Sequence, residues 1–218
     1  MPSLASSIAG YFVLAMAVSA MAAGAAGIFG ARLRSVVVYS AVLQGGYAAL
    51  GLAAGLLTGD RTGQTAAVFQ AIAGAAGITL MWISVRALAA AAGESLPLPE
   101  GAAAPAWAVF SFVLSCMSLV GLPPLAGLPA KVAVIRAGLH EPGVLFLATL
   151  GAAALGAVSL WAYSGIALRL IGGPIRTETA GASPRLRVAV DALAAVLIGL
   201  GVAPYIGFAV AAALTGGR

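Results

Sequence analysis

The sequence predicts an all-α integral membrane protein with about six transmembrane segments. Hydrophobic residues make up 62% of its 218 residues and charged residues only 8%, whereas soluble globular domains have about 45–50% and about 25%. Long stretches lack any charged side chain, and a membrane-spanning helix needs about 20 apolar residues. The single cysteine, Cys116, excludes a disulfide framework and a cysteine-rich metal site.

Charged residues mark the ends of the predicted segments. Residues 1–31 contain no charge, and Arg32 follows them. Because no basic residue precedes the first apolar stretch, we expect a retained span, not a cleaved signal peptide. We expect loops at 87–105 and 172–186. Within one membrane domain, 1–218, the predicted spans are 8–30, 35–58, 62–85, 106–139, 143–171 and 188–214.

The fourth segment is predicted to be a broken helix, interrupted at 121–127. It contains Gly121, Pro123, Pro124 and Gly127 within an otherwise apolar stretch. Proline lacks a backbone donor and clashes with the preceding turn, so two adjacent prolines interrupt a helix. The segment is therefore expected to form two halves of one discontinuous span.

Lys131, the only lysine, follows this break at once. A charged group inside a bilayer is costly and by default indicates an ion or proton site. The unpaired backbone groups of a broken helix can lower that cost, and a lysine amine can take up and release a proton as its surroundings change. The alternative is that Lys131 only extends its ammonium group to the membrane surface.

Other polar residues within the spans are weaker candidates for the same proton path. They are Tyr39 and Gln44 in the second segment, and Ser159 and Tyr163 in the fifth. Hydrogen bonds between packed helices are the alternative interpretation of these residues, and the one we prefer for Gln70 in the third segment. No phosphate-binding loop, nucleophile motif or paired carboxylates occur, so we predict no catalytic residue, cofactor site or metal site in this chain.

The basic residues are unevenly divided between the two ends of the predicted spans. Because basic residues favour cytoplasmic loops, both termini are expected outside. The expected location is a bacterial-type inner (cytoplasmic) membrane. The odd-numbered connections hold seven arginines, and the opposite side holds three: Arg32, Arg34, Arg86, Arg169, Arg176, Arg185 and Arg187 against Arg61, Arg136 and Arg218.

Three stretches of the sequence resemble signatures of antiporter-like membrane subunits. Residues 32–47, RLRSVVVYSAVLQGGY, resemble K-R-x-L-A-Y-S-S-I-x-H-x-G-Y, with Gln44 in place of the histidine. Residues 114–131, LSCMSLVGLPPLAGLPAK, resemble L-S-L-x-G-x-P-P-x-x-G-F-x-x-K-F. Residues 159–163 are similar to S-x-x-Y-Y-Y. Such subunits occur in respiratory complex I, membrane-bound hydrogenases and Mrp-type antiporters, and the resemblance is strongest to complex I subunit N.

The resemblance implies a fold and a function. The chain corresponds to the second inverted repeat of an antiporter-like module plus a terminal helix. It would be a membrane subunit of a proton-translocating NADH:quinone oxidoreductase-type complex, with Lys131 on the proton path. The chain would take part in an enzyme reaction only as a subunit of that complex. NADH, flavin, iron–sulfur clusters and quinone would be bound by partner subunits.

Partners implied by the resemblance are other membrane subunits, including one with the missing first repeat or another antiporter-like subunit, and lipid; no nucleic acid is expected. Two alternative functions stay open. One is a non-conducting structural half-module in a respiratory or hydrogenase membrane complex. The other is a subunit of a cation/proton antiporter.

Overall fold

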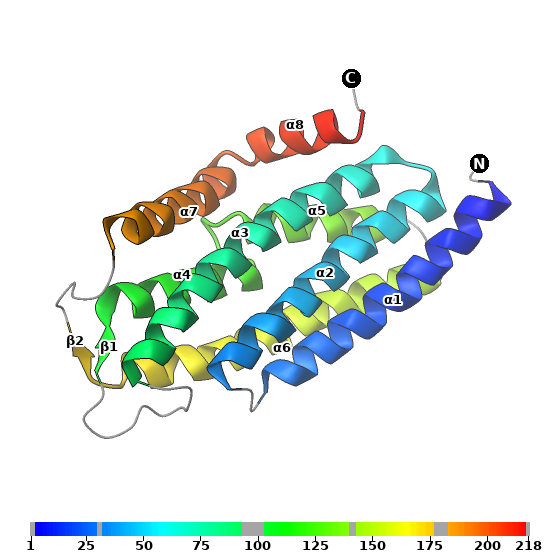
Figure 1. Ribbon diagram of the computed structural model, residues 1–218. Coiled ribbons are helices and arrows are strands. Elements are labelled where there is room, and N and C mark those ends of the chain that lie inside the picture. Colours follow the sequence, from blue (N-terminus) through cyan, green and yellow to red (C-terminus); the bar gives the residue numbers. More distant parts are fainter. Residues whose placement is uncertain (1–2, 30–31, 93–102, 140–142, 177–182, 217–218) are drawn as a thin grey trace.

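The computed structural model describes residues 3–29, 32–92, 103–139, 143–176 and 183–216 as a helical bundle (Figure 1). Among these residues, four helices (α1, α2, α3 and α6) are long and apolar enough to cross a membrane, which confirms the predicted all-α, multi-pass membrane fold. The elements in chain order are α1 Leu4–Ile28, α2 Leu33–Thr58, α3 Arg61–Ala92, β1 Ala104–Pro105, α4 Ala106–Val120, α5 Gly127–Leu139, α6 Val144–Ile171, β2 Ile175–Arg176, α7 Pro184–Val202 and α8 Pro204–Leu214.

Helices α1, α2 and α3 lie side by side along the bundle, and α6 packs against α1, α4 and α5 (Figure 1). Small residues allow the first two helices to approach closely. A Cβ atom on Gly24 would lie 2.6 Å from the Leu43 backbone nitrogen. Leu33, Leu43 and Leu50 of α2 are completely buried in the resulting core. Close contact between small residues is the usual basis of helix association in membranes.

Helix α4 ends at Val120, and α5 begins at Gly127, within the predicted interruption. Gly121 adopts a left-handed conformation with φ 94°, and its amide donates to the carbonyls of Met117 and Ser118. The connection also packs against α7, since the Ala126 amide donates to the Leu197 carbonyl at 2.8 Å. The break is therefore a hydrogen-bonded part of the fold, in which Leu125, Ala126 and Gly127 are buried and Pro123 and Pro124 are exposed.

The last predicted span, 188–214, differs from the structure. It consists of two helices, α7 and α8, which are bent by 95° relative to each other. Ala203 between them has φ −120° and ψ 66°, outside the helical region, and Pro204 supplies no amide to continue the hydrogen bonds of α7. Phe208 of α8 packs edge-on against Phe69 of α3, with ring centroids 4.8 Å apart.

Two segments predicted as loops contain a short parallel strand pair. Ala104 aligns with Ile175 and Pro105 with Arg176, and the Ala104 amide donates to the Pro174 carbonyl at 2.9 Å. Helix α3 also extends beyond its predicted end, to Ala92. Helix α7 likewise begins before its predicted start, at Pro184. Residues 93–102 and 177–182 of the predicted loops lie outside the described residues.

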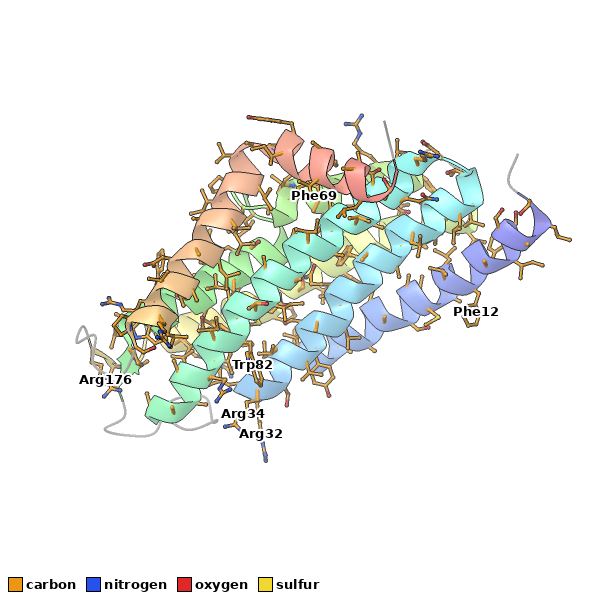
Figure 2. The ribbon with its side chains drawn as sticks, turned by 45° about the horizontal axis from the view of Figure 1, so that its top comes forward. Phe12, Arg32, Arg34, Phe69, Trp82 and Arg176 are labelled. Carbon is orange, nitrogen blue, oxygen red and sulfur yellow. The ribbon has the colours of Figure 1, made fainter. Side chains whose placement is uncertain are left out.

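The described basic side chains gather mainly toward one end of the bundle. Figure 2 shows Arg32, Arg34 and Arg176 near the end at which α2 begins and α3 finishes. Both chain termini lie at the other end (Figure 1). The helix arrangement therefore places these three arginines, from the first and fifth predicted connections, on the same side.

Candidate functional site at the helix break

The Lys131 side chain is buried in the centre of the break. It projects from the second turn of α5 and is only 6% exposed. Its Nζ donates to the Leu119 carbonyl at 2.5 Å and to the Val120 carbonyl at 3.1 Å. These carbonyls belong to the last turn of α4, where a helix leaves its acceptors without intrahelical partners. The ammonium group thus caps α4 at its electronegative end.

An aromatic ring covers the same ammonium group. Lys131 Nζ lies 4.4 Å from the ring centroid of Tyr47 on α2, within the range of a cation–π interaction. The Tyr47 hydroxyl donates to the Ala152 carbonyl of α6 at 2.6 Å, which fixes the ring. All partners that the structure describes for Lys131 are therefore neutral groups; the acidic residues in the described ranges, Asp60 and Asp191, are exposed.

Two buried amides continue the polar contacts away from Lys131. Gln44 Nε2 of α2 donates to the Leu119 carbonyl at 2.9 Å, so this one oxygen accepts from both Gln44 and Lys131. Gln70 Nε2 of α3 donates to Gln44 Oε1 at 2.8 Å. The two amides are 4% and 1% exposed. We call Gln70, Gln44 and Lys131, with the Leu119 carbonyl, the polar chain; it connects α3, α2, α4 and α5.

Three buried polar atoms in these helices have no partner in the described part of the chain. They are Gln70 Oε1, the Ser118 hydroxyl and, at the far end of α4, Trp107 Nε1. A buried polar group without a partner is costly in an apolar surrounding, and internal water commonly satisfies such groups. The region of the polar chain therefore retains hydrogen-bonding capacity that the described protein groups do not use.

Gly121 and Gly127 make the close approach of α4 and α5 possible. A Cβ atom on Gly127 would lie 1.6 Å from the Ser118 carbonyl oxygen, and a Cβ on Gly121 would lie 3.4 Å from Lys131 Cδ. Gly121 also needs the positive φ that glycine adopts readily. Pro123 and Pro124 occupy the turn between the helices, where no helical amide is required.

The structure brings only two of the five predicted proton-path residues, Lys131 and Gln44, into the polar chain. The Tyr163 hydroxyl donates to Ser40 Oγ at 2.6 Å in a separate contact between α6 and α2. Ser159 donates to the Gly156 carbonyl within its own helix. Tyr39 is 37% exposed and packs against Gly27 of α1. A role for these three residues in proton transfer stays a prediction.

Tyr47 is the participant that the sequence did not select. For Gln70 the sequence indicates a hydrogen bond between packed helices, and its bond to Gln44 confirms this prediction. Tyr47 stands in the stretch that resembles the antiporter-like signature, but nothing in that stretch indicates that its ring faces Lys131.

Long apolar helices packed around a broken segment with a buried lysine place the chain in the class of multi-pass membrane proteins with a discontinuous helix. No protein-family model matches the chain. A curated relative, NADH-quinone oxidoreductase subunit N from Methylobacterium nodulans, is 31% identical over 151 residues, which cover 63% of this chain and 29% of the relative.

Solved structures share the fold. A chain of the Mrp complex from Dietzia sp. matches 94% of this chain with a TM-score of 0.73 and 20% identity. A chain of the membrane-bound sulfane sulfur reductase, an archaeal respiratory membrane complex, matches 94% with a TM-score of 0.71 and 20% identity. A chain of respiratory complex I from Thermus thermophilus matches 91% with a TM-score of 0.59 and 22% identity.

These comparisons confirm the resemblance to antiporter-like membrane subunits that the sequence motifs predict. The protein is a multi-pass membrane protein with the fold of an antiporter-like subunit. It spans 29% of the curated relative's length and 47%, 41% and 44% of the three structural neighbours. It therefore corresponds to less than half of each of these four chains.

Proposed function

We propose that this chain is a membrane subunit of a proton-translocating NADH:quinone oxidoreductase-type complex, in which Lys131 takes up and releases a proton at the helix break. The single observation that carries the proposal is the buried Lys131 ammonium group on the unpaired carbonyls of Leu119 and Val120. A basic group at bilayer depth is rare and is a functional site by default. The relative named subunit N supports the type of complex.

The polar chain suggests how the proton reaches Lys131. The carbonyls and the Tyr47 ring stabilise the charged amine, so that burial does not exclude the protonated form. Gln44 and Gln70 are neutral amides that do not titrate, but they can orient water molecules that carry a proton. Tyr39, Ser159 and Tyr163 are proposed as further positions along this path.

The structural neighbours are chains of membrane complexes, which supports other membrane subunits as partners. We propose that one such subunit, either one that carries a first repeat or another antiporter-like subunit, packs against the exposed Pro123 and Pro124 of the helix break. Bound NADH, flavin, iron–sulfur clusters and quinone would belong to partner subunits. We place the protein in a bacterial inner membrane with both termini outside, on the count of basic residues.

Proton uptake by vesicles that contain the intact complex tests the role of Lys131. We expect Lys131→Met to reduce redox-driven proton uptake at least tenfold, because no titratable group is left. Lys131→Arg should reduce it similarly, since a guanidinium group does not release its proton. Leu128→Met, a change on the exposed face of the same helix, is the matched control. Wild-type proton stoichiometry in both Lys131 variants would overturn the proposal.

A structural half-module is the second candidate, and the neutral surroundings of Lys131 favour it. Because the polar chain offers no second titratable group in the described residues, Lys131 can also serve only to cap α4. In that case Lys131→Arg, which keeps a donor for the same carbonyls, is tolerated, and Lys131→Met lowers the stability of the protein without changing its proton stoichiometry.

A cation/proton antiporter subunit is the third candidate, supported by the structural match to a chain of the Mrp complex. Proton movement that is driven by a sodium gradient, without any electron donor, would distinguish this function from redox-driven transport.

A further inference from the structure

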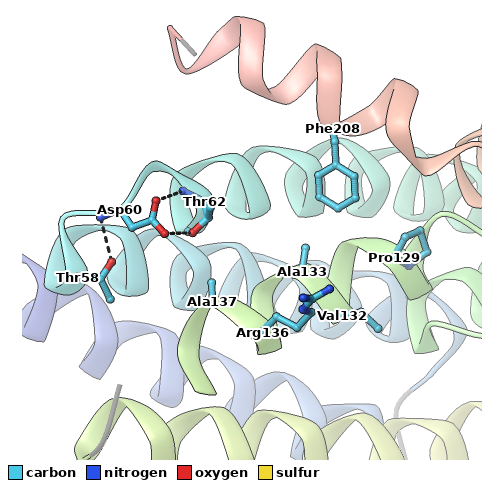
Figure 3. A pocket seen from close by; sticks show the side chains of 10 residues that line it. Thr58, Asp60, Thr62, Pro129, Val132, Ala133, Arg136, Ala137 and Phe208 are labelled. Carbon is cyan, nitrogen blue, oxygen red and sulfur yellow. Dashed lines mark hydrogen bonds between the residues drawn. The ribbon is translucent and has the colours of Figure 1, made fainter. Parts of the chain in front are cut away.

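A second polar site lies at the opposite face of α5, in a pocket of about 610 Å³ between the α2–α3 turn, α5 and α8 (Figure 3). Its volume is typical of pockets that hold small organic ligands. Thr58, Asp60 and Thr62 line one side, and Pro129 and Phe208 line the other. Lys131 does not line this pocket. Binding of a ligand in the pocket is therefore independent of the function proposed above for Lys131.

The pocket is lined by one charged side chain of each sign. The Asp60 carboxylate accepts from the Thr62 amide at 3.0 Å and from the Thr62 hydroxyl at 2.5 Å. The hydroxyl, followed by the backbone amide, lowers the pKa of Asp60, so its exposed carboxylate is charged at neutral pH. Two hydrogen bonds leave further lone pairs of the carboxylate open to a donor. Arg136 of α5 lines the same pocket, and a guanidinium fork matches a phosphate group.

The pocket changes from polar to apolar along the bundle axis. Asp60 and Thr62 stand at the start of α3, and Arg136 stands in the last turn of α5, both at the end of the bundle that holds the chain termini. Pro129 lies seven residues before Arg136, which is about 10 Å deeper along the helix. Figure 3 shows Arg136 between the Asp60 side and the Pro129 side of the pocket. Such a gradient fits a molecule with a charged head and an apolar tail at the membrane surface.

We propose that this pocket binds a zwitterionic glycerophospholipid of the phosphatidylethanolamine type. Arg136 binds the phosphate, Asp60 binds the ammonium group, and the first part of an acyl chain lies against Phe208 and Pro129. An anionic headgroup would bind Arg136 but would place a second negative charge near Asp60. A headgroup with both charges pairs with both residues. The lipid would also fill the space between α8 and α5.

Native mass spectrometry of the full chain, purified in mild detergent with its partners and then delipidated, tests this site. The probes are palmitoyl-oleoyl phosphatidylethanolamine, palmitoyl-oleoyl phosphatidylglycerol and water-soluble glycerophosphoethanolamine. We expect one phosphatidylethanolamine to be retained at this pocket, about tenfold more tightly than phosphatidylglycerol. Glycerophosphoethanolamine should bind far more weakly than the intact lipid, because it lacks acyl chains.

Matched variants assign the contacts. Asp60→Asn should remove the preference for phosphatidylethanolamine. Arg136→Gln should weaken the retention of both lipids about tenfold. Ala133→Phe fills the pocket and should displace both lipids, although it leaves all charges intact. Arg32→Gln and Asp191→Asn make the same charge changes on exposed residues outside this pocket and should leave retention unchanged.

Three results would overturn the proposal: equal retention of the two lipids by the wild type, unchanged retention in both Arg136→Gln and Ala133→Phe, or equal binding of glycerophosphoethanolamine and the intact lipid. Arg136→Lys keeps the charge and provides the test if Arg136→Gln fails to assemble. It should retain lipid more weakly than the wild type, since an ammonium group does not form the paired contact of a guanidinium; retention equal to the wild type would show that no such contact exists.

Discussion

The contact between Gln44 and Gln70 gives a quantitative prediction for the stability of the bundle. Gln44→Leu removes the bond from Gln44 to the Leu119 carbonyl and the bond that Gln44 accepts from Gln70. Leu119 keeps Lys131 as a donor. Gln70, however, is 1% exposed, and its Oε1 has no partner in the described residues, so its whole amide would be left buried and unpaired.

An unpaired buried amide costs about 1–3 kcal/mol, so Gln44→Leu should lower the free energy of unfolding by that amount. Gln70→Leu should cost less, about 1 kcal/mol, because it also removes the unpaired Oε1 atom. The double variant contains neither amide and avoids the unpaired group. We therefore expect a coupling free energy of about 1 kcal/mol, between the average of about 0.6 and the maximum of about 1.7 known for hydrogen bonds between membrane helices.

Unfolding of the protein by sodium dodecyl sulfate in mixed micelles measures all four members of this cycle. Ser84→Ala is a suitable control partner for Gln44→Leu, because the buried Ser84 hydroxyl bonds only to the Leu80 carbonyl of its own helix among the described groups. The two effects should add within about 0.3–0.5 kcal/mol, as for independent sites. A coupling near zero between Gln44 and Gln70 would refute the bond between α2 and α3.

Three further predictions concern the break, the polar surface and the topology. Gly127→Ala should destabilise the protein by more than about 2 kcal/mol in the same unfolding assay. Overpacked cores typically lose about 1–3 kcal/mol, and the new Cβ atom would overlap a backbone oxygen of α4. Gly151→Ala is the control and should be neutral or stabilising, because a Cβ atom on Gly151 would have no neighbouring atom within 4 Å. The lowered pKa of Asp60 means that its stabilising effect is present above the unfolded pKa and is lost as pH falls through the folded value, so Asp60→Asn should flatten the acidic limb of the pH–stability curve. A cysteine at the exposed Ser183, in a Cys116→Ala background, should react with impermeant reagents only from the cytoplasmic side; labelling from outside in intact cells would reverse the proposed orientation.

Much of the helical fold could be predicted from the sequence because a bilayer leaves few alternatives. An uncharged stretch that crosses hydrocarbon must satisfy its own backbone, and a helix does so. An apolar stretch does not always form one straight helix, however. Residues 188–214 stay apolar through the bend between α7 and α8, so hydropathy does not reveal the bend. Pro204 was visible, but only the packing of Phe208 against Phe69 shows that the chain turns across α3 there.

The candidate site was only partly predictable. Lys131 and Gln44 stand out because polar side chains in uncharged spans are rare, and their residue types reveal them. Their common partner, the Leu119 carbonyl, is a backbone atom and has no sequence signature. Resemblance to a motif also indicates which residues belong to a site but not which way their side chains point. Tyr39 and Tyr47 stand in the same motif-like stretch, yet Tyr39 packs against α1 and Tyr47 faces Lys131.

The spacing between the break and the lysine has a geometric reason. Side chains on a helix tilt toward its N-terminus, so Lys131, one turn after α5 begins at Gly127, extends back toward the end of α4. There it meets carbonyls eleven and twelve residues earlier in the chain. The α4 terminus needs donors and the buried ammonium needs acceptors, so each offsets the cost of the other. This mutual dependence holds whether or not the lysine carries protons, so retention of the lysine beside the break does not establish transport. Transport requires that the amine also exist without its proton, and Lys131→Arg removes that capacity while keeping a donor for the same carbonyls.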